Sequence, residues 1–205
     1  MASFDFATNM GANPNSAALI RDIATDLGFR VIKPYEGLQD AERQAKTSTL
    51  NFFLFDYSAE FSESVKKINQ LRSSKNLKVR FAPLICLVES PSKEAFVKCV
   101  NAGFDDILTL PWSATKIGER LAAQVDSTSI YFETNSYLGP DRRKYFLDEK
   151  VQIQAAPGLS HGFRRFEFSR NPHTGVHITS DRVIGRAPQR LGEANSGAVQ
   201  HRMAI

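Results

Sequence analysis

Hydrophobic residues occur in short blocks that alternate with longer, periodic stretches through the first 125 residues of the chain. Two of the blocks, residues 50–55 and 83–88, are almost continuously apolar, as is typical of strands buried on both faces of a sheet. Three shorter blocks have the character of strands as well. The pattern therefore predicts five strands, at residues 4–8, 30–32, 50–55, 83–88 and 106–110.

The stretches between these strands have the spacing of amphipathic helices. In the first, Ala17, Ile20, Ala24 and Leu27 recur at helical intervals, and Gly28 is placed to end the helix. The predicted helices cover residues 17–27, 38–45, 62–71, 93–102 and 113–125. Strict alternation of strands and helices predicts an α/β fold, a doubly wound sheet of five parallel strands in the flavodoxin-like order. Functional groups of such a sheet lie at the carboxyl ends of its strands, here after Thr8, Asp56, Val88 and Leu110.

Three segments at these strand ends carry a family resemblance: LNFFLFDYS, PLICLVES and NAGFDDILTLPW. With them, the chain from residue 3 to residue 125 resembles the receiver (CheY-like) domain of bacterial response regulators. The resemblance implies a domain that accepts a phosphoryl group on an aspartate, with Mg²⁺ held by carboxylates because the transferred group is highly charged.

Carried over position by position, the resemblance places the phosphoacceptor at Asp56. The family's other four functional positions, an acidic pair, a Ser or Thr and a Lys, fall on Gly11, Ala12, Val88 and Leu110, with Glu89 following Val88. One of five functional groups is thus retained, so neither Mg²⁺ nor any other cofactor is expected. Asp56 could instead be a remnant that caps the next turn or accepts a hydrogen bond from a loop amide.

The resemblance therefore implies a degenerate receiver that binds a protein partner, or a second copy of itself, without phosphorylation. Trp112, the only tryptophan, is a candidate anchor on the face that receivers commonly use for partners, or else a partly buried core residue. The alternative is a conventional response regulator, a switch in which Asp56 is still phosphorylated. An enzyme is not expected, because the sequence shows no nucleophile–base pair and no metal-ligand cluster.

The charge of the chain changes near Gly139 and Pro140. Residues 1–139 contain 15 Lys and Arg against 16 Asp and Glu, whereas residues 140–205 contain 11 against 6 and all four histidines. We therefore expect a receiver-like domain at 1–126 and a basic extension at 127–205. The string YLGPDRRK is similar to a "Y-x-GPDRR" element that follows receiver-like domains in alphaproteobacteria. Its Gly-Pro-Asp indicates a turn, and Arg142, Arg143 and Lys144 are candidates for binding an anion or a partner, or for docking on acidic residues of the first domain.

Farther along, apolar and polar residues alternate on both sides of the turn sequence NPHTG. This predicts a small hairpin at about 150–180, followed by a flexible tail at 181–205. Arg164 and Arg165 are interleaved with phenylalanines, a pattern that fits a surface for cyclic di-GMP or nucleic acid, or a plain solvated face. His173 and His177 are too far apart on an extended strand to share a metal ion.

Composition and hydropathy indicate the class of protein and its location. Of 205 residues, 42% are hydrophobic and 23% charged, which is ordinary for a globular protein. The sequence contains no apolar run of about 18 residues and no secretory signal at its beginning, so we expect a cytoplasmic protein with no membrane partner. Cys86 and Cys99 lie in apolar surroundings and are expected to be buried thiols.

Overall fold

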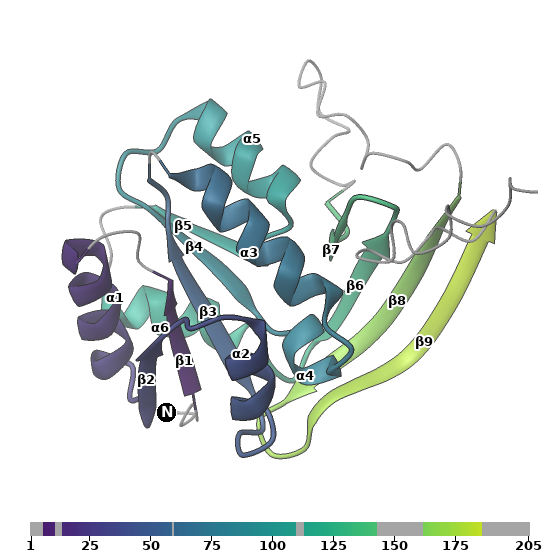
Figure 1. The fold of residues 1–205 in the computed structure, drawn as a ribbon, viewed down its shortest axis with the longest axis horizontal. Helices are drawn as coiled ribbons and strands as arrows, with labels where there is room; N and C mark the ends of the chain where they lie inside the picture. Colours follow the sequence, from purple (N-terminus) through teal and green to yellow (C-terminus); the bar gives the residue numbers. More distant parts are fainter. Residues whose placement is uncertain (1–5, 11–13, 59, 110–112, 143–161, 186–205) are drawn as a thin grey trace, which may run out of the picture.

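The fold is taken from a computed structural model, which describes residues 6–10, 14–58, 60–109, 113–142 and 162–185 (Figure 1). Several residues named above lie outside these ranges: Gly11, Ala12, Leu110, Trp112, Arg143 and Lys144. None of the helices in the described part of the chain is long and apolar enough to cross a membrane.

A parallel sheet forms the centre of the first part of the chain. Its strands are β1 (Phe6–Met10), β2 (Val31–Pro34), β3 (Asn51–Asp56), β4 (Leu84–Val88) and β5 (Asp106–Thr109), in the order β2-β1-β3-β4-β5. Every neighbouring pair is parallel. The predicted α/β fold with flavodoxin-like order is therefore confirmed. The first strand covers Phe6–Met10, and its predicted start at residue 4 lies outside the described residues.

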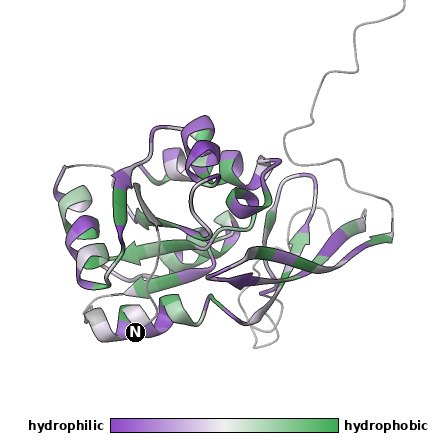
Figure 2. Cartoon of the chain, turned by 90° about the horizontal axis from the view of Figure 1, so that it is seen from below, coloured by the Kyte–Doolittle hydropathy of each residue, from purple (hydrophilic) through white to green (hydrophobic). Residues whose placement is uncertain are grey.

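Helices cover both faces of this sheet because side chains along a strand alternate between the faces. On one face, α1 (Pro14–Asp26) and α6 (Ala114–Ala122) pack against Phe52, Leu54, Ile85 and Leu87. On the other face, α2 (Leu38–Gln44), α3 (Phe61–Ser73) and α5 (Lys93–Ala102) pack against Phe53, Phe55, Leu84 and Cys86. Figure 2 shows the central strands as mostly hydrophobic. Burial on both faces explains why the blocks at β3 and β4 are continuously apolar.

Local signals set the ends of α5. The Ser92 hydroxyl accepts a hydrogen bond from the Ala95 amide, 3.0 Å away, and so caps the first turn. Gly103 ends the helix with φ of 87°, a left-handed conformation that favours glycine. One short helix, α4 (Leu77–Arg80), was not predicted; it lies between α3 and β4 and is too short to show periodicity.

The second part of the chain forms an antiparallel sheet. Its strands are β6 (Thr128–Glu133), β7 (Leu138–Pro140), β8 (Gly162–Asn171) and β9 (Gly175–Gly185), in the order β7-β6-β8-β9. Strands β8 and β9 pair as a hairpin within the region, about residues 150–180, where the sequence predicts one. Residues 150–161 of that region lie outside the described residues.

Two expectations for this region are wrong. The tail was expected to begin at residue 181, but β9 continues to Gly185, because its last residues pair with the start of β8. The turn expected at Gly-Pro-Asp lies earlier, where the Thr134 amide bonds to the Tyr137 carbonyl oxygen at 2.8 Å. Gly139 and Pro140 belong to β7, paired with Phe132 and Tyr131.

The two sheets share an apolar contact. Phe81, which precedes β4, packs against Tyr131, Leu138, Phe166 and Phe168 of the second sheet. The nearest ring centroid, that of Phe168, is 4.7 Å from the Phe81 ring. The second sheet therefore lies against the amino-terminal end of β4, and Asp56 lies at the opposite, carboxyl edge of the parallel sheet (Figure 1).

Candidate functional site

Asp56 is the last residue of β3 and reaches the carboxyl edge of the sheet, as predicted. Beside it lies a cavity of about 540 Å³, lined by Asn15, Ser16, Leu19, Ile20, Asp56, Tyr57, Ser58, Leu87 and Glu89. The Tyr57 amide continues the ladder by donating to the Leu87 carbonyl oxygen at 2.9 Å, which holds the end of β3 beside β4. Sequence reasoning thus identified two groups that share this cavity, Asp56 and Glu89.

The polar side chains in the described lining of this cavity are mainly carboxylates and hydroxyls. Its described lining contains two carboxylates, those of Asp56 and Glu89, and neither Lys nor Arg. Val88, at the position where the resemblance implies a Ser or Thr, is 2% exposed and brings no hydroxyl. Among the described residues, no three His, Cys, Asp or Glu side chains lie close enough together to hold a metal ion.

A second, wider cavity of about 760 Å³ adjoins the first and shares Tyr57, Ser58 and Glu89 with it. Lys98 of α5 lines this cavity and makes an ion pair with Glu94 at 2.7 Å. That ion pair, with a smaller contribution from Tyr57, raises the pKa of Lys98. The ammonium group of Lys98 is therefore already matched by a carboxylate one helical turn away.

The two cysteines are free and buried, as predicted. The Cys86 and Cys99 sulfur atoms lie 3.5 Å apart between β4 and α5. The hydrogen bond between them, together with burial, raises the pKa of the Cys86 thiol. A buried thiol that resists ionisation is a poor nucleophile, so this pair is part of the core rather than a reactive site.

The arginines proposed to bind anions make contacts within the chain. Arg142 donates to the carbonyl oxygens of Phe104 and Asp105 at 2.9 and 2.7 Å, so it docks on backbone oxygens of the first part of the chain. Arg164 forms a two-pronged ion pair with Asp181, and Arg165 pairs with Glu167 in the same strand.

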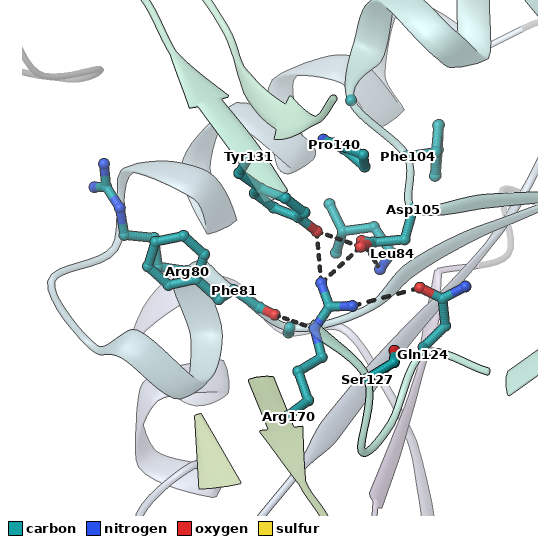
Figure 3. A network of polar contacts seen from close by, with 12 residues as sticks. Arg80, Phe81, Leu84, Phe104, Asp105, Gln124, Ser127, Tyr131, Pro140 and Arg170 are labelled. Atoms are coloured by element: carbon teal, nitrogen blue, oxygen red, sulfur yellow. Dashed lines mark hydrogen bonds and ion pairs between the residues drawn. The ribbon is translucent and has the colours of Figure 1, made fainter. Parts of the chain in front are cut away.

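A buried polar network joins the two sheets, and sequence reasoning missed it (Figure 3). The Asp105 carboxylate, immediately before β5, accepts hydrogen bonds from Arg72 of α3 at 2.8 Å and Arg170 of β8 at 2.6 Å. The Tyr131 hydroxyl also donates to it, and so does the Leu84 amide, at 2.8 Å. The side chains of Asp105, Arg72 and Arg170 are each 2% exposed or less.

Ionisation in this network follows from its charges. Burial alone would raise the pKa of Asp105, but the guanidinium groups of Arg170 and Arg72 outweigh it and hold the pKa below its usual range. Burial raises the pKa of Tyr131 to about 12, so the hydroxyl stays protonated and remains a donor to Asp105. Two arginines share one carboxylate. Arg72 also donates to the carbonyl oxygens of Arg80 and Ala82, at 2.8 and 3.0 Å, and Arg170 Nε donates to that of Phe81 at 2.7 Å. The buried Nε of Arg72 has no hydrogen-bond partner among the described residues.

A second buried ion pair lies near this network. Arg80 of α4 binds Glu133 at the end of β6, and the Glu133 side chain is 1% exposed. The sequence offers one signal for the network and for this ion pair, namely that the charged residues stand next to apolar strands. A charged side chain that is buried there needs a partner. The partners come from distant parts of the chain, so the pairing itself was not readable.

No protein-family profile matches the chain, and no curated protein is significantly similar to it in sequence. Solved structures similar to it include a CheY-like protein, TadZ, from Pseudomonas aeruginosa, at 9% identity with a TM-score of 0.47, over 58% of this chain and 98% of that one. The receiver domain of a sensor histidine kinase from the same organism matches at 20% identity and a TM-score of 0.47, over 60% of this chain and 97% of that one. An orphan response regulator from Helicobacter pylori matches at 17% identity and a TM-score of 0.40, over 58% of this chain and 94% of that one.

Proposed function

We propose that this protein is a degenerate receiver that acts as a protein-interaction module in signal transduction, without phosphorylation of Asp56. The observation that carries the proposal is the lining of the cavity beside Asp56. It combines the aspartate at the end of β3, where the resemblance places a phosphoacceptor, with walls that supply no cationic side chain among the described residues.

Magnesium chemistry fits this donor set poorly. Mg²⁺ demands near-octahedral oxygen ligands and is usually recruited by carboxylates. The positions where the resemblance implies an acidic pair are Gly11 and Ala12, which have no ligand atoms in their side chains. Asp56 and Glu89 are therefore the two carboxylates that remain in the described lining of this cavity.

Loss of the lysine also argues against phosphorylation of Asp56. The corresponding position is Leu110, whose side chain cannot neutralise a phosphoryl oxygen. Loss of such charge stabilisation costs about 3–4 kcal/mol of transition-state energy per donor, or roughly two to three powers of ten in rate. Both the cation and the lysine would have to be replaced for Asp56 to be phosphorylated at a useful rate.

Phosphorylation of the full-length chain tests the proposal directly. The protein is incubated with acetyl phosphate and Mg²⁺, and its intact mass is followed over time, with Asp56→Asn as the matched control. We expect no species heavier by one phosphoryl group. A phosphorylated species that is lost in Asp56→Asn would establish the conventional switch instead and refute the proposal.

Partner binding provides the second measurement. Affinity purification with the wild-type chain and with Asp56→Asn, compared under native conditions, is expected to recover the same partners in the same amounts. Partners that bind only the wild-type chain, and only after treatment with acetyl phosphate, would contradict a phosphorylation-independent role.

A further inference from the structure

In the part of the chain that the structure describes, β9 is an edge strand of the antiparallel sheet. It pairs with β8 on one side and has no described strand on the other. Its residues become exposed toward the end of the strand, so that Asp181 to Gly185 are all at the surface. Val183 and Ile184 are 50% and 44% exposed, which is unusual for adjacent large aliphatic residues.

A change of register divides β9 into two parts. Glu167 pairs with Ser180 and Phe168 pairs with Ile178, so Thr179 is the extra residue of a bulge. Before the bulge, Val176 and Ile178 pack against the apolar contact between the sheets. After it, residues 180–185 pair regularly with residues 162–167 and contain no proline. This terminal part of β9 therefore presents a row of backbone groups without a further bulge, the feature that allows another strand to pair with an edge.

Charge distinguishes the two faces of this terminal part. Arg182 lies directly opposite Arg165, and Arg165 in turn lies opposite Phe132 of β6. Residues opposite one another share a face, and like charges there are destabilising. Arg165 is matched by Glu167, whereas Arg182 makes no ion pair within the described ranges. On the other face, Asp181 is already matched by Arg164.

An added strand would pair with the backbone groups along this edge of β9. Its residue opposite Arg182 would lie on the face with surplus positive charge, and a carboxylate there would remove the repulsion. The next two residues would lie beside Val183 and Ile184, on alternating faces, where aliphatic side chains would cover exposed apolar surface. A second copy of β9 would instead bring a further Arg182 to the same stretch, so charge favours an acidic partner over self-association.

From these observations we propose that Ser180–Gly185 receives an extended segment of a partner protein as an additional strand, with a carboxylate opposite Arg182 and aliphatic residues beside Val183 and Ile184. This rests on the proposed function and specifies the surface and the chemistry of the partner.

A synthetic peptide tests this with the full-length protein. The probe is a fluorescent, end-blocked peptide with a Glu-Val-Ile core flanked by threonines, whose core residues lie opposite Arg182, Val183 and Ile184 when it pairs parallel to β9. Binding is followed by fluorescence anisotropy. We expect saturable binding, with slower amide hydrogen exchange at Ser180–Gly185. Arg182→Glu should weaken binding at least about tenfold, since it places like charges together. A Lys-Val-Ile peptide should restore the affinity for Arg182→Glu.

The matched control is Lys66→Glu, the same charge change at an exposed position of α3, which should leave the affinity unchanged. Absence of saturable binding, an equal loss in Lys66→Glu, or failure of the Lys-Val-Ile peptide to bind Arg182→Glu would overturn the proposal. So would a dimer of the wild-type protein in sedimentation equilibrium that Val183→Lys dissociates, because a second copy would then occupy the edge.

The two proposals fail separately. If the peptide does not bind and acetyl phosphate leaves Asp56 unmodified, only the proposal that the edge of β9 receives a partner strand is refuted. Phosphorylation of Asp56 refutes the proposed function, whatever the peptide does.

Discussion

Replacing Asp105 with asparagine removes the one carboxylate that two buried arginines share. Asparagine has nearly the same volume, so packing against Leu84 and Tyr131 is preserved. Its amide NH₂ group, however, would face the guanidinium donors of Arg72 or Arg170, which now lie 2.8 and 2.6 Å from carboxylate oxygens. Both guanidinium groups would then be buried without a counter-charge.

The size of the effect follows from this burial. Breaking a buried ion pair by removing one partner costs about 3–5 kcal/mol, because the remaining charge is left uncompensated. The expected loss is therefore a large share of the roughly 5–15 kcal/mol by which a typical domain is stable. Urea denaturation, followed by circular dichroism and by tyrosine fluorescence, measures the free energy of unfolding.

The neighbouring residue offers a matched control. Asp106 is also buried, at 4% exposure, but its partner Arg120 is 58% exposed, so water can solvate that guanidinium when the pair is broken. Asp106→Asn should cost about 1 kcal/mol or less. Equal losses for the two substitutions, or a loss below about 1 kcal/mol for Asp105→Asn, would refute the idea that the buried network holds the two sheets together.

The remaining predictions concern the same junction. Tyr131→Phe removes a donor to Asp105 and should lower the free energy of unfolding by about 1–3 kcal/mol, whereas Tyr57→Phe, at the far edge, should change it little in the same denaturation assay. The pKa of Asp105 is lower in the folded state, so its contribution is present above the unfolded-state value of about 4 and is lost as pH falls through the folded value. Denaturation series below pH 4 should therefore show a steeper loss for the wild type than for Asp105→Asn; parallel curves would contradict this. Gly103→Ala should destabilise by at least about 1 kcal/mol, because φ is positive there and a Cβ would meet the Leu138 carbonyl oxygen at 3.0 Å. Thermal unfolding measures this effect, and an unchanged midpoint would show that β7 moves away freely.

The parallel sheet was readable from the sequence because its signals are local. Continuous apolar blocks identify β3 and β4, and helical spacing with Ser92 and Gly103 as caps identifies α5 almost to the residue. The position of Asp56 at the end of β3 follows from the same pattern. Each of these signals is contained within about a dozen neighbouring residues.

Strands β6 and β7 were missed for the opposite reason. The partner of β6 is β8, so Thr128 pairs with Ser169 far along the chain, and no local pattern records that pairing. The three residues of β7 are too few for alternation to be visible. Their strand conformation is a consequence of pairing and of burial against Phe81.

Asp105 and Asp106 show most clearly what local sequence can and cannot specify. The two residues are chemically identical and adjacent, and the pattern NAGFDDILT places both at the start of a strand. Folding buries both carboxylates, but it places Asp105 between the buried Arg72 and Arg170, which are 98 residues apart in the chain (170 − 72), and Asp106 beside the exposed Arg120 of α6. Periodicity specifies which face a side chain takes, but the charges that meet there come from distant segments, so only the assembled fold specifies the partners of a buried charge.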